Sequence, residues 1–503
     1  MKKEADHYKR NYEKLQIEMD EFKAQVSDMI ALTVKQAVHE ATEPLKIELE
    51  KAHDEIKRLK AVIKKDSSNS SKPPSTDGFN KVMNSREPSN KKQGGQIGHT
   101  GHRLSLPKNM DKLEKEGILE KRLVDHTNGS KDYIVRHVVD VEIKVIVTEH
   151  RFKNKADIPK EMLNEVSYGD ELKAFSIILM NDGMIANKRL SQIISGLTNN
   201  TINLSTGTFV SFRKQFVKKL EAQGALEEII EDVLNQEVIH VDDTSLKVLQ
   251  RPIYPEEPDE DQEIKMEQAK KKTFNSTLRT YSSKTSTLYT INPGKGDDGI
   301  KRDNVLPRYH GIIVQDGESK FFNYGINNGL CHAHILRKLK GLKELCHCEW
   351  AGGAMEQFMK MSDHKNNDIA NGIKECDQAV FASFGNEYDQ LVEDGRVALK
   401  HMEEVKESWG YDELRKVLNF LEKRKDNILL FLKNYEVPST NNQAERDLRA
   451  DKTKQKVSGM FRSWEGLKDH IKIRSFVSTA KKRDFNIASA IKSVFKGNSL
   501  LTS

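Results

Sequence analysis

QEVIHVDDT, residues 236–244, is the stretch that decides the fold, because in it a β-branched run ends in two acids, Asp242 and Asp243. HGIIVQDG, residues 310–317, repeats this plan and ends in Asp316. Short apolar runs of this kind predict buried strands. Side chains at the carboxyl ends of neighbouring strands project into the crevice where open α/β sheets bind ligands. We therefore expect both strands to end at these acids and to bring Asp242 and Asp316 to one site.

The two aspartates allow two interpretations. Either each one simply ends a strand or begins a turn, or their carboxylates share a cation. Oxygen ligands that converge on one point suit Mg²⁺ or Mn²⁺, which keep several waters and bind phosphate oxygens. Because both acids follow β-branched runs in one basic chain, we favour the shared site.

The sequence around these runs predicts a mixed sheet and many helices. TLRTYSS at 277–283 and TLYTIN at 287–292 alternate like antiparallel strands. YPEEPDEDQE at 254–263 has six acids in ten residues, so it should be a solvated loop. Residues 332–435 are almost wholly helical in pattern. The fold class is therefore α/β, a mixed sheet flanked by helices with a large all-helical insertion.

A third acid lies on a predicted helix, 441–457. Asn441 or Asn442 can cap this helix, and Glu445 has Arg449 four residues further on. Either the two form an ordinary surface ion pair, worth roughly 0.3–0.5 kcal/mol, or Glu445 is a metal ligand beside cations that hold phosphate. Taken alone, the ion pair is the simpler interpretation.

Residues 1–65 carry the apolar seam of a coiled coil. Apolar side chains recur at steps of four and three from Tyr8 to Met29, and a second seam follows Pro44, which we expect to interrupt the first. A long helix with a narrow seam cannot bury it alone. The seam therefore predicts either a homo-oligomer or a hairpin that folds back, and we favour the homo-oligomer.

The next segments are less apolar. Residues 66–110 are rich in Ser, Pro and Gly, which predicts a disordered basic linker that either lies along DNA or is merely solvated. Residues 133–148 are rich in Val and Ile and predict strands, so we expect a small β-rich segment at 111–165.

Residues 166–235 predict helices near 169–182, 187–197 and 205–222. Ser205 is a plausible cap for the third helix, which carries four bases, Arg213, Lys214, Lys218 and Lys219. Three short helices with a basic third are either a helix-turn-helix that reads DNA or a helical connector to the next domain. We favour the connector.

Composition excludes several classes of protein. With 36% hydrophobic and 31% charged residues, the chain is too polar to be one uniformly packed globule of 503 residues. We expect no membrane partner, because no stretch approaches the ~20 apolar residues of a membrane span. Four cysteines in so long a chain are no disulfide framework, so a reducing cytoplasm is the expected location. The basic charge gathers between Arg446 and Lys496, with 14 Lys and Arg against five acids.

Five motifs stand in an order that resembles the insertion sequence 66 family of DDE transposases. The family's usual forms are NSSKPPSSDG, KPGGQPGHxGH, a strand with DET, CxAHxxRK and DNNxAERxxR. The matching stretches are NSSKPPSTDG (69–78), KKQGGQIGHTGH (91–102), VDDTSLKVL (241–249), GLCHAHILRKL (329–339) and STNNQAERDLR (439–449).

The resemblance implies an RNase H-like catalytic core. Asp242, Asp316 and Glu445 match the family's catalytic acids and would hold two divalent ions, Mg²⁺ or Mn²⁺. Asp243 stands where the family usually has Glu, which makes it the reserve ligand. The implied reaction is cleavage of DNA followed by transfer of the freed 3′-hydroxyl, with one ion activating the nucleophile and the other stabilising the leaving oxygen.

Further residues have expected roles that follow from their chemistry. Arg446, Arg449 and Lys452 are our candidates for DNA phosphate contacts, since guanidinium groups suit phosphate. Cys331 and His334 are expected to brace the core beside Asp316.

Two departures from the family pattern stand out. Residues 103–165 contain no cysteine where the family commonly has a zinc ribbon, so the ribbon position is degenerate. Thr440 replaces the Asp that often precedes the Asn pair. We do not expect zinc elsewhere, because Cys346 and Cys348 would point to different faces of a helix.

Together these observations predict a DNA transposase, associated with the nucleoid, that acts as a homo-oligomer on the terminal inverted repeats of its own element and on target DNA. Small accessory proteins of the same element are expected partners. The alternatives are a non-enzymatic or inactive DNA-binding architectural protein and an RNase H-like nuclease without strand transfer. The expected segments are coiled coil 1–65, linker 66–110, β-rich segment 111–165, helical region 166–235, catalytic core 236–334, helical insertion 335–437, and the end of the core with a basic tail, 438–503.

Overall fold

The computed structural model describes residues 2–66, 68–70, 106–126, 128, 131–162, 164–249, 273–404, 408–499 and 501. Most of the predicted linker and the acid-rich loop at 254–263 lie outside the described residues. The chain divides into two compact units. We call residues 83–327 and 441–503 the sheet unit, and residues 1–82 and 328–440 the helical unit.

A five-stranded mixed sheet confirms the expected α/β class. Its strands are β1 (Val238–Val248), β2 (Phe274–Ser282), β3 (Thr287–Asn292), β4 (Ile312–Gln315) and β5 (Asn327–Leu330), in the spatial order β3-β2-β1-β4-β5. β1 pairs antiparallel with β2, β2 pairs antiparallel with β3, and β1 pairs parallel with β4. The antiparallel pair expected at 277–292 is therefore confirmed.

β1 is longer than the sequence pattern predicts. We expected this strand to end at Asp242, but it continues to Val248. The reason lies in its two neighbours: β2 pairs with β1 from His240 to Val248, whereas β4 has only four residues and pairs with Val238–His240 alone. The parallel part of the sheet thus stops just before Asp242 although the strand runs on.

The sheet unit also contains helices. They are α2 (Met110–Lys115), α3 (Asp170–Asn181), α4 (Asn187–Leu197), α5 (Thr206–Ala222), α6 (Ala225–Leu234), α8 (Asp297–Asp303), α14 (Asn442–Ser458), α15 (Trp464–Lys482) and α16 (Ile487–Lys496). Of these, α6, α8, α14 and α15 contact the strands. Short 3-10 turns stand at Lys155–Asp157, Lys160–Met162, Leu306–Arg308 and Ser319–Asn323. The three helices predicted between 169 and 222 and the one at 441–457 are all present.

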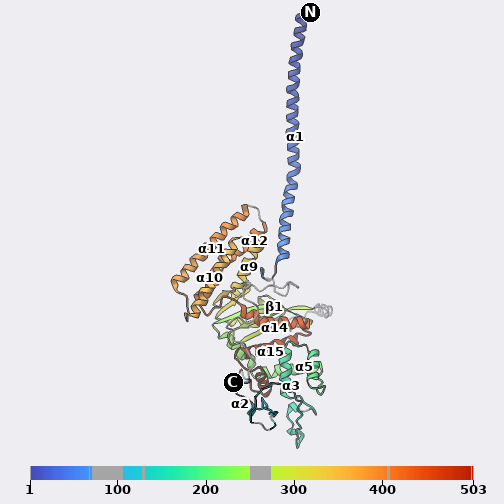
Figure 1. The fold of residues 1–503 in the computed structure, drawn as a ribbon, viewed down its shortest axis with the longest axis vertical. Helices are drawn as coiled ribbons and strands as arrows, with labels where there is room; N and C mark the ends of the chain where they lie inside the picture. Colours follow the sequence, from blue (N-terminus) through green and yellow to red (C-terminus); the bar gives the residue numbers. More distant parts are fainter. Residues whose placement is uncertain are drawn as a thin grey trace. The chain divides into compact units, whose positions relative to one another are not determined.

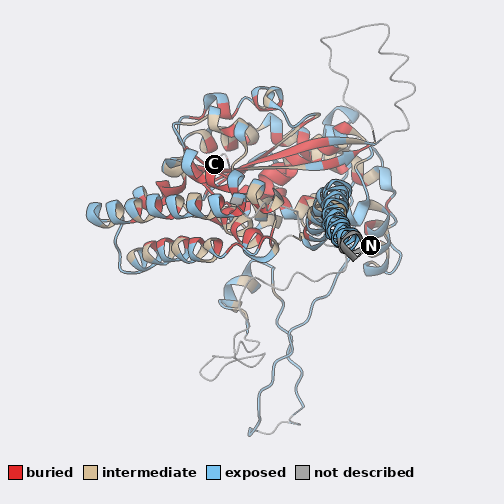
Figure 2. Cartoon of the chain, turned by 90° about the horizontal axis from the view of Figure 1, so that it is seen from above, coloured by how far each residue is buried: buried red, intermediate tan, exposed pale blue. Residues whose placement is uncertain are grey.

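The main core of the sheet unit joins segments that are far apart in sequence. Ile239 and Val241 of β1 belong to the same buried cluster as Phe216 of α5, Phe476 of α15 and Val494 of α16. Figure 2 shows the strands in the colour of buried residues. Burial of such side chains contributes about 1.5–3 kcal/mol each, so the helices near the end of the chain are part of what holds the first strand in place.

The strands expected at 133–148 do not form. The described residues between 118 and 153 contain no strand, and they are extended and exposed, with Val138 at 92% and Val147 at 91% of full exposure. Alternating β-branched residues make a strand only where a neighbouring strand and a core accept them. Within the described part of the chain, this segment has neither.

The helical unit consists of α1 (Lys2–Lys64), α9 (His332–Leu345), α10 (Trp350–Ala370), α11 (Gln378–Glu404), α12 (Ser408–Lys423) and α13 (Lys425–Lys433) (Figure 1). α1 is continuous, and Pro44 lies inside it without ending it. A proline removes one backbone hydrogen bond, and the helical turns on both sides carry the helix across that position. No helix in the described ranges is long and apolar enough to cross a bilayer.

The apolar seam of α1 is uncovered. Tyr8, Leu15 and Phe22 are 73%, 65% and 64% exposed, and Figure 2, which views α1 nearly end-on, shows its described turns in the colour of exposed residues. Single exposed apolar residues are ordinary on protein surfaces, but a continuous row marks an interaction face.

The end of α1 is fixed within the helical unit by Asn69, the first residue of the NSSKPPSTDG motif. Asn69 Oδ1 accepts from the backbone N–H of Asp66 (2.9 Å), and Nδ2 donates to Lys64 O (3.2 Å) and Glu344 Oε2 (3.4 Å). A Cβ at Gly341 would collide with the backbone oxygen of Asn69. Glycine at this position therefore lets the turn after α1 approach α9 closely.

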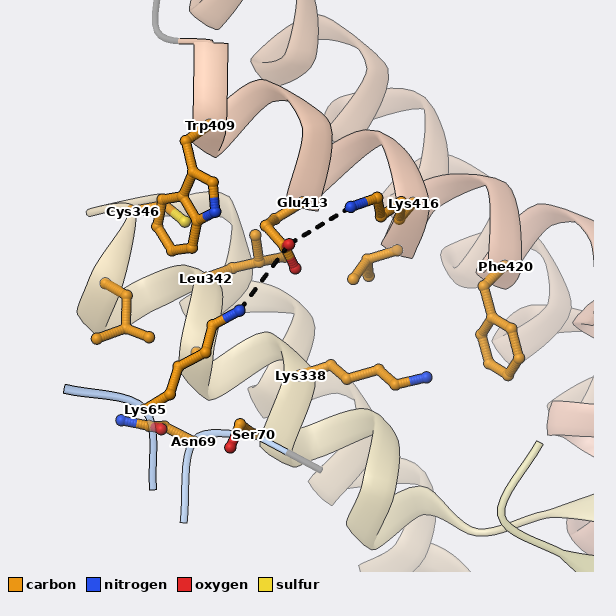
Figure 3. Close-up of a pocket in the computed structure, with 13 residues that line it drawn as sticks. Lys65, Asn69, Ser70, Lys338, Leu342, Cys346, Trp409, Glu413, Lys416 and Phe420 are labelled. Atoms are coloured by element: carbon orange, nitrogen blue, oxygen red, sulfur yellow. Dashed lines mark ion pairs between the residues drawn. The ribbon is translucent and has the colours of Figure 1, made fainter. Parts of the chain in front are cut away.

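A cavity of about 360 Å³ lies beside this junction (Figure 3). Lys65 Nζ lies 3.9 Å from Glu413 and 5.2 Å from the ring centre of Trp409. Lys338 Nζ lies 4.6 Å from the ring centre of Phe420. Cation–π contacts and one carboxylate thus hold the lysines where α1 meets α9 and α12.

Candidate active site

The register of β1 and β4 puts two of the predicted acids side by side. His240 pairs with Val314 at the last step of the parallel ladder. Asp242 and Asp316 each follow their member of this pair by two residues. Neighbouring strands lie about 4.8 Å apart, so the two carboxylates share the place where the ladder ends.

The third predicted acid, Glu445, lies in the first turn of α14. The pKa of Asp242 lies well above its ordinary value of 3.8, first because of burial, then because of the Asp316 carboxylate, with Asp243 and Glu445 adding to it. The pKa of Asp316 is also raised, by burial and then by Glu318 and Asp243, although Lys295 opposes this. The charges of Asp316 and Glu445 therefore both act on Asp242.

Asp243, the next residue along β1, is in a different situation. Adjacent residues of a strand point to opposite faces, and the Asp243 side chain is fully buried. It forms ion pairs with Lys320, with Lys295 (3.0 Å) and with its cross-strand neighbour Arg279 (3.6 Å). Three cations neutralise this one carboxylate, which makes it a structural acid.

The Arg279 side chain extends that network into the sheet. Arg279 is fully buried and also pairs with Asp303 of α8. Asp303 accepts further hydrogen bonds from the Tyr281 hydroxyl (2.8 Å) and from Asn292 Nδ2 (2.6 Å). A buried charge is tolerated when it is paired and hydrogen-bonded in this way.

Asp242 and Asp316 have no comparable neutralisation. Within the described ranges neither carboxylate forms an ion pair, and the hydrogen bond to the Asp242 side chain comes from the backbone N–H of Asp243 (2.8 Å). Asp242 and Asp243 are thus neighbours in sequence with opposite electrostatic surroundings. Of the two, Asp242 is the acid that a cation would stabilise.

Asn441 connects the strand that carries Asp242 to the helix that carries Glu445. It is fully buried just before α14. Its Nδ2 donates to the Val241 carbonyl (2.9 Å), and its Oδ1 accepts from His240 Nδ1 (3.0 Å). Since burial lowers the pKa of His240 to about 4, this histidine is neutral and its one N–H is used here.

Further along α14, Asp447 attaches the helix to the β2–β3 hairpin. Its Oδ2 accepts from Ser282 Oγ (2.6 Å), Thr287 Oγ1 (3.1 Å) and Lys482 Nζ (3.1 Å). The hydroxyl of Tyr289 donates to the backbone oxygen of Asp447 (3.0 Å). With Asn441, these bonds fix both the position and the rotation of α14.

The bases predicted to contact DNA lie on the same helix. Arg446 and Arg449 are exposed, and Arg449 Nη2 lies 4.0 Å from Glu445 Oε2. Lys452 Nζ donates to the backbone oxygen of Ser245 (2.6 Å), and the charge of Asp242 opposes the burial that lowers the pKa of Lys452. Lys452 therefore helps to hold α14 on β1, and phosphate contact by these three residues stays a prediction.

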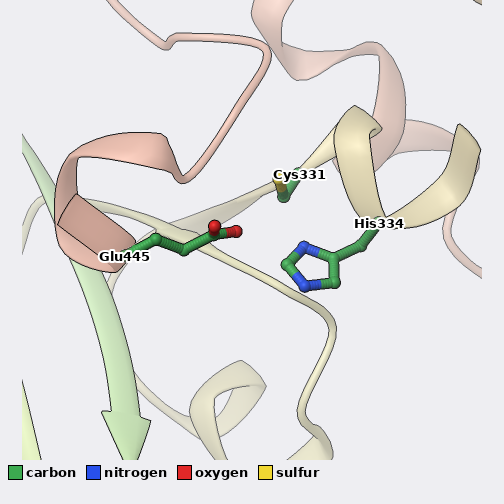
Figure 4. Close-up of side chains that lie close together, drawn as sticks. All are labelled: Cys331, His334 and Glu445. Atoms are coloured by element: carbon green, nitrogen blue, oxygen red, sulfur yellow. The ribbon is translucent and has the colours of Figure 1, made fainter. Parts of the chain in front are cut away.

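Cys331 and His334 belong to the helical unit, at the start of α9 (Figure 4). Cys331 is buried at the N-cap, and His334 Nε2 lies 3.2 Å from Arg337 Nη1. Their bracing of the core beside Asp316 stays a prediction. Cys346 and Cys348 do not lie on a helix as predicted, because α9 ends at Leu345 and both cysteines follow it. The expectation that they point to different faces of a helix is therefore wrong.

The sequence signals for the supporting residues were weak. The sequence predicts Asn441 only as a possible helix cap. In the structure its side chain makes no cap hydrogen bond to α14, and its amide binds β1 instead. Arg279 gave a usable signal, since an arginine inside a run of buried strand residues requires an acidic partner. Asp303 could not be chosen as that partner from spacing alone.

Comparison with known families identifies the class of the protein. The model described as "Transposase IS66 family" matches residues 165–469, more than half of the chain and a range that contains Asp242, Asp316 and Glu445. The chain is therefore a DNA transposase, an enzyme that acts on DNA. It belongs to the IS66 family of transposases.

A second family model covers the first part of the chain. A model described as "Family of unknown function (DUF6444)" matches residues 9–105. No curated protein matches this chain.

Replacing Asn441 tests the bridge between β1 and α14. Asn441→Ala leaves the Val241 carbonyl and the His240 N–H buried without their partner, which should cost roughly 1–3 kcal/mol. We expect hydrogen exchange to show that loss of protection in the amides of β1 and the first turns of α14. Asn442→Ala, at the exposed neighbouring residue, is the matched control. Equal protection in the two variants would contradict the bridge.

Proposed function

We propose that this transposase cleaves DNA at the ends of its own insertion sequence and joins the freed 3′ ends to target DNA, with Asp242, Asp316 and Glu445 as the catalytic acids. The observation that carries the proposal is the placement of Asp242 and Asp316 at the end of the β1–β4 ladder, without ion-pair partners for either among the described residues, where the charge of Glu445 also reaches Asp242. An RNase H-like core with this triad is what the family resemblance implies.

The donor set fits two hard divalent cations, Mg²⁺ or Mn²⁺. All three side chains offer carboxylate oxygens, the ligands that these ions prefer. The contrast with Asp243 supports the fit, because the protein supplies three cations to that acid. Bound at Asp242, Asp316 and Glu445, the ions would activate the attacking water or 3′-hydroxyl and stabilise the leaving 3′-oxygen.

The chain's own groups orient the DNA and the ligands. Asn441 and Asp447 hold α14 so that Glu445 keeps its place relative to the strands. Arg446 and Arg449 are exposed on the same helix and would bind phosphates of the DNA backbone. Such positioning supplies much of the rate in phosphoryl transfer.

α1 supports a second part of the proposal, a homo-oligomer. Its seam is exposed over more than 20 residues in a single chain. A second copy of α1 offers an identical seam and would bury both in a coiled coil. We also propose that the enzyme works at the nucleoid, where its DNA substrate is, and that small proteins of the same element assist it.

Loss of one acid should abolish cleavage. In Mg²⁺ or Mn²⁺, we expect the full-length enzyme to cut duplexes that carry the terminal inverted repeat, and Asp316→Asn to be slower by roughly a thousandfold or more. Asp298→Asn, an exposed acid of α8, is the control and should cut normally. If Asp316→Asn cuts as fast as the wild type, the site is wrong. Detection of strand-joined products would distinguish a transposase from a nuclease that only cleaves. If the wild type does not cut at all, the protein is a non-enzymatic or inactive DNA-binding protein.

Metal binding should also appear in thermal stability. Because the pKa values of Asp242 and Asp316 are raised in the folded state, their charges destabilise the metal-free fold at pH 7, and the effect disappears as the pH falls below about 3.8. Asp242→Asn should therefore raise the melting temperature in EDTA at pH 7. Mg²⁺ at a hundredfold excess over Kd should stabilise the wild type by about 2.7 kcal/mol per ion and the variant less. Equal Mg²⁺ responses would argue against Asp242 as a ligand.

Charges on the seam should dissociate the oligomer. We expect light scattering to give a lower mass for Leu15→Glu with Phe22→Glu in the full chain, since buried carboxylates are costly in a coiled-coil seam. Ala24→Glu with Ser27→Glu adds the same charge off the seam and should keep the mass of the wild type. A mass unchanged by the seam substitutions would remove the oligomerisation proposal.

A further inference from the structure

A long acid-free window covers α4 and α5. From Gly183 to Leu220 the sequence has no Asp or Glu, yet it has six bases, Lys188, Arg189, Arg213, Lys214, Lys218 and Lys219. The chain as a whole has 76 acids in 503 residues, so a window of this length would ordinarily contain several. Phosphate-binding surfaces require this exclusion of negative charge.

The connection between α4 and α5 is held in one shape. Asn199 and Asn200 adopt left-handed backbone angles, with φ of 49° and 60°. Ser191 Oγ of α4 donates to Leu204 O (2.6 Å), and Ser205 Oγ caps α5 by accepting from Thr208 N (3.1 Å). The loop from 198 to 205 is longer than the turn of a compact helix-turn-helix, but these bonds fix it.

Hydrophobic packing fixes the two helices in the sheet unit. Leu190 and Ile194 of α4 share one buried cluster with Phe209, Phe212 and Phe216 of α5. α5 therefore cannot turn about its axis, and it presents a defined face outward.

The four bases of α5 fall into two pairs with different surroundings. Arg213 Nε lies 3.7 Å from Asp469 of α15, and Lys219 Nζ donates to the backbone oxygen of Phe495 (2.6 Å). These two hold α5 on the body of the unit. The side chains of Lys214 and Lys218 are exposed.

The outward face of α5 is continuous, polar and basic. It lines a shallow depression and consists of Gly207, Val210, Ser211, Lys214, Gln215 and Lys218. The spacings of three, one, three, one and three residues place all six on one side of a helix. Gln215 Nε2 donates to Ser211 Oγ (3.1 Å), so an amide and a hydroxyl lie together between the lysines.

We propose that α5 enters the major groove of the duplex at the ends of the element and reads its sequence with this face, which assigns the recognition step to the α4–α5 pair. The inference rests on the proposed function and adds the segment that selects the DNA. A helix fits the major groove, and helix-turn-helix proteins place the second helix of the pair there.

The chemistry of each position suits that arrangement. Gly207, near the start of α5, lets the backbone approach the DNA closely. Ser211 and Gln215 offer hydrogen bonds to base edges, and Gln pairs well with adenine. Lys214 and Lys218 bind phosphate or guanine. At the start of α4, Lys188 and Arg189 are exposed and would contact the flanking backbone.

The test measures binding by full-length protein to a labelled duplex that carries the inverted repeat from the DNA flanking the gene. A scrambled duplex of the same length and base composition is the reference. Lys214→Ala with Lys218→Ala should weaken binding to the repeat roughly tenfold or more and lower the salt slope by about two. Lys301→Ala with Lys496→Ala removes the same charge from exposed sites elsewhere in the sheet unit and should bind like the wild type.

Substitution of the polar pair tests sequence reading separately from charge. Ser211→Ala with Gln215→Ala should keep the salt slope while the preference for the repeat over the scrambled duplex falls roughly tenfold. All these changes place alanine in a helix, so the circular dichroism melt checks that the fold is retained.

The outcomes separate this inference from the proposed function. If the enzyme cleaves repeat DNA and the α5 variants bind it as the wild type does, α5 is not the reader and the inference fails while the function stands. If the α5 variants lose binding as expected but the wild type never cleaves, the inference stands and the proposed function fails. A loss of binding in the Lys301→Ala with Lys496→Ala control as large as that in α5 would also overturn the inference.

Discussion

The buried amide of Asn441 is the constraint on which the site depends. It joins residues about 200 positions apart, because it binds the Val241 carbonyl and the His240 ring on one side and begins α14 on the other. Asp242 is the residue after Val241, and Glu445 is four residues after Asn441. A shift of α14 along the sheet would break both hydrogen bonds at once, so Asn441 is the contact nearest to both acids that ties the helix to the strand.

The two-residue period of a strand explains how one pair of acids serves two purposes. Asp243 points to the face where Arg279, Lys295 and Lys320 neutralise it, and there it contributes to stability. Asp242 points to the other face, towards Asp316 and Glu445, where negative charge accumulates.

Local patterns in the sequence predicted a large part of this architecture, and non-local partners decided the rest. The helices α3, α4, α5 and α14 follow from periodicity, α5 with its Ser205 cap, and the two aspartates follow from β-branched runs. The predicted end of β1 at Asp242 was wrong, because the strand continues along β2 after β4 has ended. The prediction of strands at 133–148 was wrong for the converse reason. Among the described residues, no partner strand pairs with this segment and no core buries it. Asn441 and Asp303 matter through contacts that spacing cannot reveal.

One consequence follows from the place of the last helices in the core. Ile239 and Val241 are buried with Phe476 and Val494, although more than 230 residues are synthesised between them. A nascent chain therefore exposes β1 on the ribosome until α15 and α16 have emerged, and a product of premature termination within the helical insertion has neither Glu445 nor a closed core. The core that holds β1, and with it the site proposed at Asp242, can therefore close only after α15 and α16 have been synthesised.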